Sequence, residues 1–340
     1  MKRRSFLLGG LSAGAACSRG PRLNVYNWSD YISTDVVRGF EREFALQVHY
    51  GTYESNQEML AQVMSGNSGW DVVFPSEDFI GPMRELGLLA ELDHGRLPNL
   101  KNLAPEFQRP PWDPDLRWSV PYMHGCTGIL YQSNLPHPPL AWADLWQESL
   151  RGRVTMLDDP PEVFAAALKK LGYSLNSADP QQLRQARDQA VAQKILLRGY
   201  LNAEARDQAI AGDLLAAQAW AVTAAQAIAA APGKFSFSFP REGFPRFADN
   251  VAILRESGRQ ERAHQWIDYL LRPQSAAAIV ISTQTATANG EATRLLPPGV
   301  RQNPVLYPSQ EILERGEWFQ APTAASQRLR DRLWSEIKSS

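Results

Sequence analysis

Acidic and aromatic side chains stand together at four separate places in this sequence. The first is YNWSDY at residues 26–31, directly after a short apolar run. The others are SEDF at residues 76–79, LDDPPEVF at residues 157–164 and FAD at residues 247–249. The two-residue period of a strand places the Phe and the Asp of the last motif on one face. Trp220 adds a single large ring within an alanine-rich stretch.

This combination of side chains suits an organic polycation. An ammonium group taken out of water needs a carboxylate, because an unpaired buried charge is very costly. The methylenes between two ammonium groups pack against flat apolar walls, and an aromatic face also attracts a cation by ~0.5–2 kcal/mol. The recurrence therefore predicts a site for an amine that carries several charges.

Each place also has a purely structural interpretation. Asp30 can cap a helix that follows it, and Trp28 and Trp220 can be core residues. Asp159 and Glu162 stand three residues apart at a helix start, where free N–H groups and the helix dipole favour acids. Any single place is explained well in this way. The repetition of one chemistry at four places favours the cation site.

The elements around the first two places indicate an α/β protein. Residues 23–28, 46–52 and 71–74 have strand character, and an apolar helical face repeats over residues 34–44. The sequence SNQE at residues 55–58 is a capping box that opens a second helix. Strands that alternate with helices predict a mainly parallel sheet, whose ligands bind beyond the carboxyl ends of the strands. Both acidic loops occupy such a position.

Downstream, a proline-rich stretch over residues 105–139 interrupts the alternation, and we interpret it as an extended crossing between two domains. Residues 203–231 are alanine-rich and favour helix on both sides of Gly212-Asp213. The other expected elements are helices over 142–150, 162–171 and 261–271 and strands over 235–239 and 247–254.

Composition excludes several functional classes. The 340 residues are 44% hydrophobic and 21% charged, which is typical of a packed protein of about two domains. The formal net charge is −1, and no basic block follows the first few residues, which argues against a nucleic-acid partner. The five histidines lack metal-ligand spacing, and no nucleophile elbow or phosphate loop is complete. We therefore expect no catalytic residues, no metal and no cofactor.

The N-terminus has the pattern of an export signal over residues 1–17. Lys2-Arg3-Arg4 precedes a short apolar stretch, and RRSFL at residues 3–7 resembles a twin-arginine motif. GAAC at residues 14–17 resembles a lipoprotein box, in which Cys17 is acylated. As an alternative, AGA at residues 13–15 would serve as an ordinary cleavage site. We expect a periplasmic protein with at most this lipid anchor on the membrane. Cys126 then has no intrachain partner, and we expect a small buried hydrophobe there.

The whole chain after the signal resembles the periplasmic spermidine/putrescine-binding proteins of polyamine ABC importers. The matching stretches, in order, are NVYNWSDYI, TYESNQEML, DVVFPS, LPNLKNL, SVPYMHGCTGI, WADLW, RGRVTMLDDPPEVFAAALKKLGYS and RGEWF. The resemblance implies a type II periplasmic binding protein fold, with two discontinuous α/β lobes, a hinge and a ligand cleft between them. The lobes are expected over residues 18–124 with 248–293 and over residues 125–247 with 294–340.

The resemblance also implies a set of ligand-binding residues. The first-loop acid, the acid pair and the last acid would hold ammonium groups, and the rings would enclose the alkyl chain. The residues that match the family's cleft are Trp28, Ser29, Asp30, Tyr31, Ser76, Asp78, Asp159, Glu162, Trp220, Phe247 and Asp249. The expected partners are a polyamine and an ABC transporter permease.

Five positions depart from the family and bear on the choice of amine. Phe247 stands where Trp is frequent, and Thr223 stands where some putrescine-preferring members have Asp. Thr285 replaces a Tyr, Phe319 replaces a polar residue, and Asp78 is an acid where relatives have Tyr or Ser. The loss at Thr223 leads us to expect spermidine in preference to putrescine.

Other functions stay open at this point. A zwitterion such as γ-aminobutyrate (GABA) needs a cationic partner for its carboxylate, usually Arg. Arg246 is the nearest candidate, but it alternates with Phe247 and Asp249 and should point away from them. A polyamine sensor has the same sequence features as a transport protein. An exported enzyme on this scaffold would need a nucleophile and a base in the cleft, and no His falls among the expected cleft positions.

Overall fold

The computed structural model describes residues 21–340. The expected export signal, with Cys17, lies outside the described residues. The chain begins with the alternation that the sequence predicts. The elements are β1 (Arg22–Trp28), α1 (Thr34–Phe44), β2 (Gln47–Tyr53), α2 (Asn56–Met64), β3 (Val72–Val73) and α3 (Glu77–Glu85). β1 pairs in parallel with both β2 and β3, so the predicted parallel arrangement is confirmed here.

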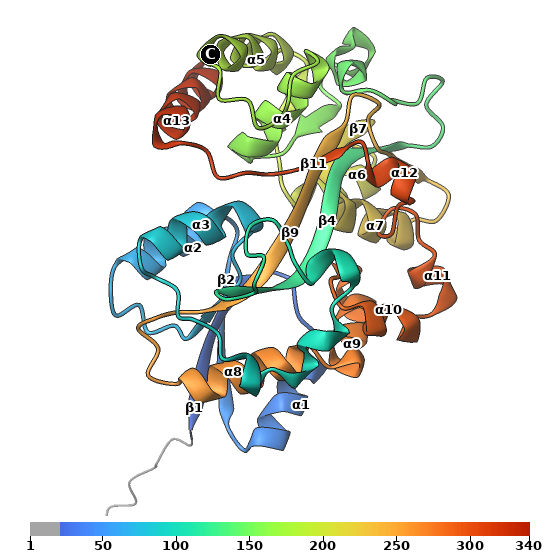
Figure 1. Cartoon of the computed structure of the whole chain (residues 1–340). Coiled ribbons are helices and arrows are strands. Elements are labelled where there is room, and N and C mark those ends of the chain that lie inside the picture. Colours follow the sequence, from blue (N-terminus) through green and yellow to red (C-terminus); the bar gives the residue numbers. More distant parts are fainter. Residues whose placement is uncertain (1–20) are drawn as a thin grey trace, which may run out of the picture.

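Two long antiparallel strands connect the two lobes of the molecule. They are β4 (Ser119–Gln132) and β9 (Phe244–Ile253), and Figure 1 shows both running from one lobe into the other. The strand order β2-β1-β3-β9-β4-β7-β5-β6 places them at the centre of the sheet. The register between them shifts next to Pro121, a residue that has no N–H for the ladder and is therefore accommodated at a bulge.

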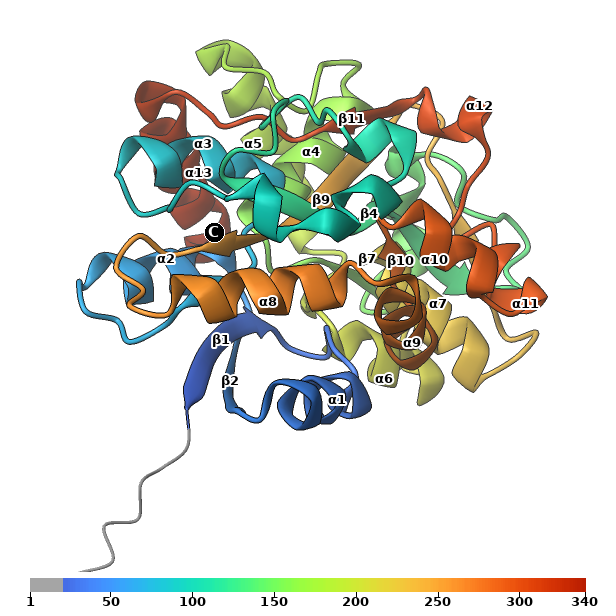
Figure 2. The same ribbon diagram turned by 60° about the horizontal axis from the view of Figure 1, so that its bottom comes forward.

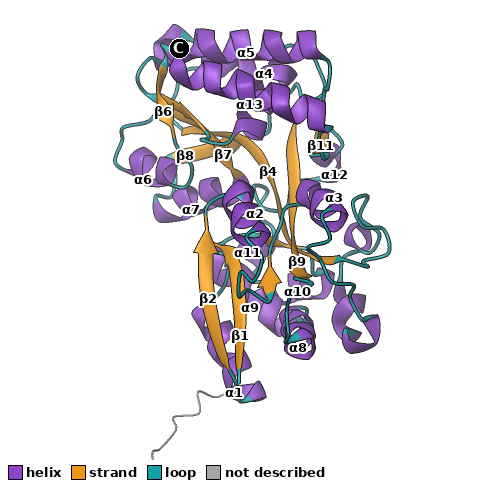
Figure 3. Ribbon diagram, turned by 90° about the vertical axis from the view of Figure 1, so that its left-hand side faces the viewer, coloured by secondary structure: helices purple, strands orange, loops and turns teal. Residues whose placement is uncertain are grey.

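The second lobe is built around the far end of the same sheet. Its elements are β5 (Val154–Met156), α4 (Pro160–Lys170), α5 (Pro180–Lys194), β6 (Leu197–Tyr200), α6 (Glu204–Ile210), β7 (Ala216–Trp220), α7 (Ala221–Ala230) and β8 (Phe235–Ser238). Figure 3 shows β6 and β7 at one end of the molecule and β1 and β2 at the other.

The chain then returns to the first lobe and finally to the second. The remaining elements are α8 (Gln260–Leu270), α9 (Pro273–Thr283), β10 (Ala286–Thr287), α10 (Gly290–Leu295), α11 (Pro298–Arg301), α12 (Gln310–Leu313), β11 (Gly316–Trp318) and α13 (Ala324–Ser339). In Figure 1, α1, α8 and α9 lie in one lobe, and α4, α5 and α13 lie in the other. No helix within residues 21–340 has the length and apolar character needed to cross a membrane.

Two expectations about local structure need correction. The alanine-rich stretch is interrupted by a strand, β7, and is not helical throughout. β7 pairs with β4 on one edge and β5 on the other, and its first four side chains are buried. Burial within a sheet overrides the helix propensity of alanine. Residues 142–150 form two short 3₁₀ helices, Trp142–Trp146 and Glu148–Leu150. The proline-rich stretch contains the whole of β4, which contributes to the cores of both lobes, so the extended crossing expected there is observed.

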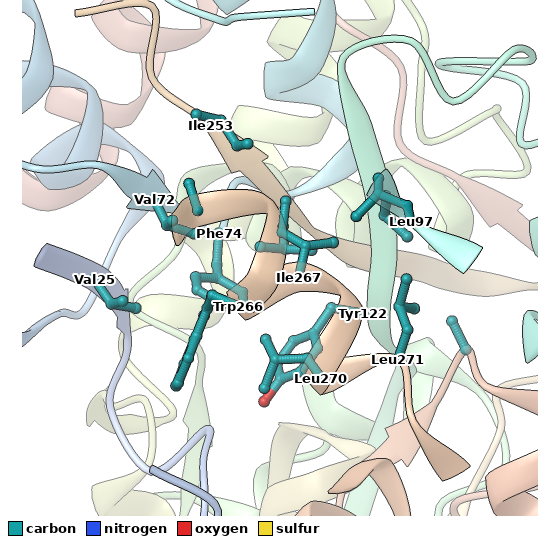
Figure 4. Packing of buried hydrophobic residues seen from close by; sticks show 14 of the residues in the cluster. Val25, Val72, Phe74, Leu97, Tyr122, Ile253, Trp266, Ile267, Leu270 and Leu271 are labelled. Carbon is teal, nitrogen blue, oxygen red and sulfur yellow. The ribbon is translucent and has the colours of Figure 1, made fainter. Parts of the chain in front are cut away.

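The two lobes have separate hydrophobic cores. One cluster of buried side chains is drawn from residues 23–123 and 248–288 and includes Trp266 of α8, which contacts the ring of Phe40 edge-on. Figure 4 shows part of this cluster around α8, and Figure 2 brings α8 to the front. The other cluster is drawn from residues 126–244, with two residues of α13. Because β4 and β9 contribute to both clusters, they connect two bodies that are packed independently.

Candidate ligand-binding cleft

A single cleft of about 1090 Å³, part of it open to solvent, is lined by all eleven side chains that the resemblance pointed to. They come from the ends of strands and the starts of helices in both lobes. The lining also contains residues that were not predicted as site residues: Glu54, Asn56, Gln57, Phe79, Pro161, Asn202, Ala203, Val222, Thr223, Gln226 and Phe319. Glu54 and Asn202 follow β2 and β6 closely, so the rule that parallel strands end at a binding site would have found them.

The end of β1 and the loop after it present Trp28, Asp30 and Tyr31 to the cleft. The indole N–H of Trp28 donates to the carbonyl oxygen of Phe74 at 2.8 Å, which fixes the ring at the strand end. Asp30 has a φ of 57°, a left-handed conformation that Asp tolerates better than most residues. The residue that precedes the first turn of α1 is Ser33. Asp30 therefore does not cap α1, and its exposed carboxylate is directed to the cleft.

The start of α4 provides Asp159 and Glu162 from the second lobe. Asp159 is the N-cap of α4 and accepts a hydrogen bond from the backbone N–H of Glu162 at 3.3 Å. The capping role and a place in the cleft therefore coexist. Glu162 is 3% exposed, and its Oε1 accepts from Thr127 Oγ1 at 2.7 Å and from Trp220 Nε1 at 3.1 Å. Its Oε2 is buried without any hydrogen-bond partner.

The connecting strand β9 contributes Phe247 and Asp249, both of which line the cleft as the strand period requires. Asp249 Oδ1 accepts a hydrogen bond from Ser76 Oγ at 2.7 Å, which joins β9 to the N-terminus of α3. Gly125 of β4 lies opposite Phe247, and a Cβ at this position would lie 2.5 Å from the ring. Glycine therefore leaves the space that the ring of Phe247 occupies beside β4.

Burial raises the pKa of four acids in this cleft. Desolvation is the largest cause for each, and it raises the pKa of Asp159 and Asp249 to about 6. The pKa of Asp78 rises to about 7, with repulsion from Asp159 and Asp249 as a further cause. Glu162 lies close to Asp159 and reaches a pKa of about 8. Neighbouring carboxyl groups therefore disfavour the ionisation of one another.

The lining has a strong charge asymmetry. Within residues 21–340, six acidic side chains line the cleft and no Lys, Arg or His does. Arg246 lies outside it, as the strand period predicts: its guanidinium donates to Glu106 at 3.0 Å and lies 4.1 Å from the ring centre of Trp318. An organic cation would relieve the repulsion among the acids, whereas an anionic group would add to it.

Four of the five positions that depart from the family line the cleft, and one does not. Thr223, Phe319, Phe247 and Asp78 line the cleft, whereas Thr285 is buried outside its lining. Thr285 therefore lacks both the ring and the position from which a side chain would touch a ligand. Cys126 is buried without a disulfide, and burial raises the pKa of its thiol to about 12, which fits the small buried hydrophobe that the sequence predicts.

Comparison with known proteins is consistent with this geometry. The spermidine/putrescine-binding periplasmic protein of Escherichia coli is 31% identical over 330 residues, which cover 95% of this chain and 94% of that protein. A putrescine/cadaverine-binding protein of Pseudomonas aeruginosa is 30% identical over 352 residues and covers 99% of both chains. A solved structure described as a putative spermidine/putrescine ABC transporter, from Listeria monocytogenes, superposes with a TM-score of 0.90 at 28% identity. It covers 93% of this chain and 98% of its own.

These similarities confirm the resemblance to periplasmic polyamine-binding proteins and the two-lobed α/β fold. They also confirm the expectation that the chain is a binding protein and not an enzyme. The match to a family extends over residues 39–306, which is most of the chain. The chain belongs to the family of bacterial extracellular solute-binding proteins.

Proposed function

We propose that this protein captures a polyamine outside the cytoplasm and delivers it to an ABC importer. The unpartnered Oε2 of Glu162, buried in a cleft that six acids line, is the observation that carries the proposal. A buried carboxylate oxygen without a donor is costly, and an ammonium group supplies both the missing donor and the missing charge. The names of the relatives, which refer to spermidine, putrescine and cadaverine, support the same class of ligand.

The distribution of acids along the cleft favours a ligand with more than two charges. Asp159 and Glu162 lie at the start of α4. The other three carboxyl groups belong to Asp78 of α3, Asp249 of β9 and Asp30 in the loop after β1. We assign these five carboxylates to ammonium groups. The aromatic residues of the lining, Trp28, Tyr31, Trp220 and Phe247, are assigned to the alkyl segments, and Ser29 and Ser76 to hydrogen bonds.

Spermidine is our first choice over putrescine. Thr223 lines the cleft near Trp220 and carries no charge, so a short diamine lacks an anchor that some relatives provide. A triamine instead extends to further carboxylates and gains an ion pair for each additional ammonium group.

Binding by hinge motion follows from the placement of these groups. We propose two lobes, residues 18–124 with 248–293 and residues 125–247 with 294–340, that close around the amine through bending of β4 and β9. The closed form would then dock on the permease. The export signal over residues 1–17, with acylation at Cys17, would place the protein in the periplasm and anchor it to a membrane.

Titration of residues 18–340 with spermidine, spermine, putrescine and GABA tests the proposal, with tryptophan fluorescence as the readout. Trp28 and Trp220 line the cleft and report its occupancy. We expect saturation by spermidine at about micromolar concentration or below. Putrescine should bind more weakly, with a Kd that is about tenfold higher for each ~1.4 kcal/mol of binding free energy that it lacks. The variant Glu162→Gln should lose most of this affinity.

Glu311→Gln is the matched control, because Glu311 is exposed on α12 and does not line the cleft. It should bind as the unmodified protein does. No response to any of the three polyamines would overturn the proposal, and a response to GABA alone would replace it by a zwitterion-binding function. Putrescine binding tighter than spermidine would retain the class and reverse the preference.

A further inference from the structure

A short segment near the C-terminus touches both lobes. We call residues 316–320 the strap: they comprise β11 and the two residues that follow it. β11 pairs in parallel with β9, with Gly316 opposite Phe244 and Trp318 opposite Arg246. Figure 1 shows β11, in red, beside the upper part of β9. Phe319 and Phe247 directly follow the last pair of this register, and both residues line the cleft.

Side chains of the second lobe hold one side of the strap. Glu317 forms an ion pair with Lys169 of α4 and accepts a hydrogen bond from Ser174. Asn176 donates to the carbonyl oxygen of Trp318 at 2.9 Å, and its Oδ1 accepts from the N–H of Gln320 at 3.0 Å. Two contacts to the side chain of Glu317 and two to the backbone of the strap therefore attach it to the second lobe.

The first lobe holds the opposite side through Glu77 and the ring of Trp318. Trp318 packs against the core of the first lobe and contacts Trp112, with ring centres 5.3 Å apart. Glu77 begins α3 and is 1% exposed. Its Oε2 accepts from the backbone N–H of Ala248 at 2.9 Å, and its Oε1 accepts from the backbone N–H of Phe319 at 3.2 Å.

We propose that Glu77 is a positioning residue that ties the strap to the first lobe and thereby holds the cleft closed around its ligand. The inference rests on the proposed function, because it assumes hinge closure around an amine. Glu77 does not line the cleft, so it acts through its neighbours. One carboxyl group connects three parts of the structure: the start of α3 with Asp78, the connecting strand β9, and the strap that carries Phe319.

Amine release from the variant Glu77→Gln tests this role. An amide side chain has only one oxygen, so one of the two backbone N–H groups loses its acceptor and faces an N–H₂ group instead. We expect the dissociation rate of spermidine, measured by stopped-flow fluorescence, to rise about tenfold while the association rate changes less than about twofold. This is the loss expected for one buried hydrogen bond. Hydrogen exchange of the peptide that contains the Phe319 amide should also become faster.

Glu85→Gln is the control, because Glu85 is exposed at the other end of the same helix. A second pair of variants tests the bond from its donor: Phe319→Pro removes both the N–H and the ring, and Phe319→Ala removes the ring alone. Faster release from Phe319→Pro than from Phe319→Ala supports the role of Glu77, and this comparison holds even if Glu77→Gln folds poorly.

Two results would overturn the inference: unchanged release and unchanged exchange in Glu77→Gln, or the same effect in Glu85→Gln. If the unmodified protein binds no polyamine, the proposed function fails. Hydrogen exchange of the strap without ligand then decides the inference separately, because faster exchange in Glu77→Gln supports the tie and unchanged exchange rejects it.

Discussion

At the scale of single residues, Asp159 combines two roles that substitutions separate. Its carboxylate caps α4 and also faces the cleft. Asn is as good an N-cap as Asp, whereas Ala is not. We expect Asp159→Asn to retain the free energy of unfolding within ~0.5 kcal/mol and Asp159→Ala to lose ~1 kcal/mol. Both variants should bind spermidine ~10–100-fold more weakly, because a charge-assisted contact is lost.

Urea denaturation gives the free energy of unfolding of these two variants, and calorimetric titration gives their affinity for spermidine. If Asp159→Asn bound spermidine as tightly as the unmodified protein, Asp159 would be a cap alone. The same logic extends to Glu162, whose second oxygen lacks a partner although its first accepts two hydrogen bonds. A residue with a purely structural role would be expected to use both oxygens.

At the scale of elements, the strand β2 depends on a glycine that sequence reasoning did not single out. A Cβ at Gly51 would lie 2.4 Å from the ring of Trp70, which stacks on Tyr26 at 4.6 Å. Tyr26 in turn contacts Tyr53, which packs against Trp28 at the cleft. A column of rings thus connects the edge of the first lobe to its binding loop.

We expect Gly51→Ala to destabilise the protein by ~1–3 kcal/mol, since a rigid indole has to shift or the strand has to deform. Gly199→Ala in β6 is the matched control, because a Cβ there meets no atom within 4 Å. The difference between the two variants in urea denaturation checks the prediction. Equal stabilities would show that the column adapts without cost.

The elements that the sequence predicted well are those whose side chains repeat with a clear period. α1 matches its expected bounds because one apolar face determines it, and β1 matches closely because a short apolar run marks a buried strand. β7 was missed because alanine favours helix locally and only the neighbouring strands β4 and β5 select an extended chain. Glu77 was quoted in a motif but not selected, since its two partners lie 171 and 242 residues away.

At the scale of the whole molecule, the acids of the cleft couple folding to pH. The pKa values of Asp159, Asp249, Asp78 and Glu162 are raised to between about 6 and about 8 in the folded protein. In the unfolded chain these groups release their protons near their ordinary values of ~4. At pH values between ~4 and about 8 the folded state binds more protons than the unfolded chain, so rising pH favours unfolding. The ligand-free protein should therefore lose stability from about pH 5 to about pH 8.

A polyamine reverses this dependence because it binds the ionised carboxylates. Bound ligand stabilises the folded state by about 2.7 kcal/mol at a concentration of 100 Kd, and Kd itself should fall as the acids lose their protons. We therefore expect the increase in Tm caused by a fixed spermidine concentration to be larger at about pH 8 than at about pH 5.5. Scanning calorimetry at both pH values, with and without spermidine, measures this difference.

The variant Glu162→Gln removes the group with the highest pKa of the four. Its ligand-free stability should decrease less between about pH 7 and about pH 8 than that of the unmodified protein, because one proton fewer is released on unfolding in this range. Glu311→Gln should retain the original profile, since its side chain is exposed outside the cleft. A ligand-free stability that rose with pH over this range would mean that the acids of the cleft are ionised without a cation, and the electrostatic basis of amine capture would have to be rejected.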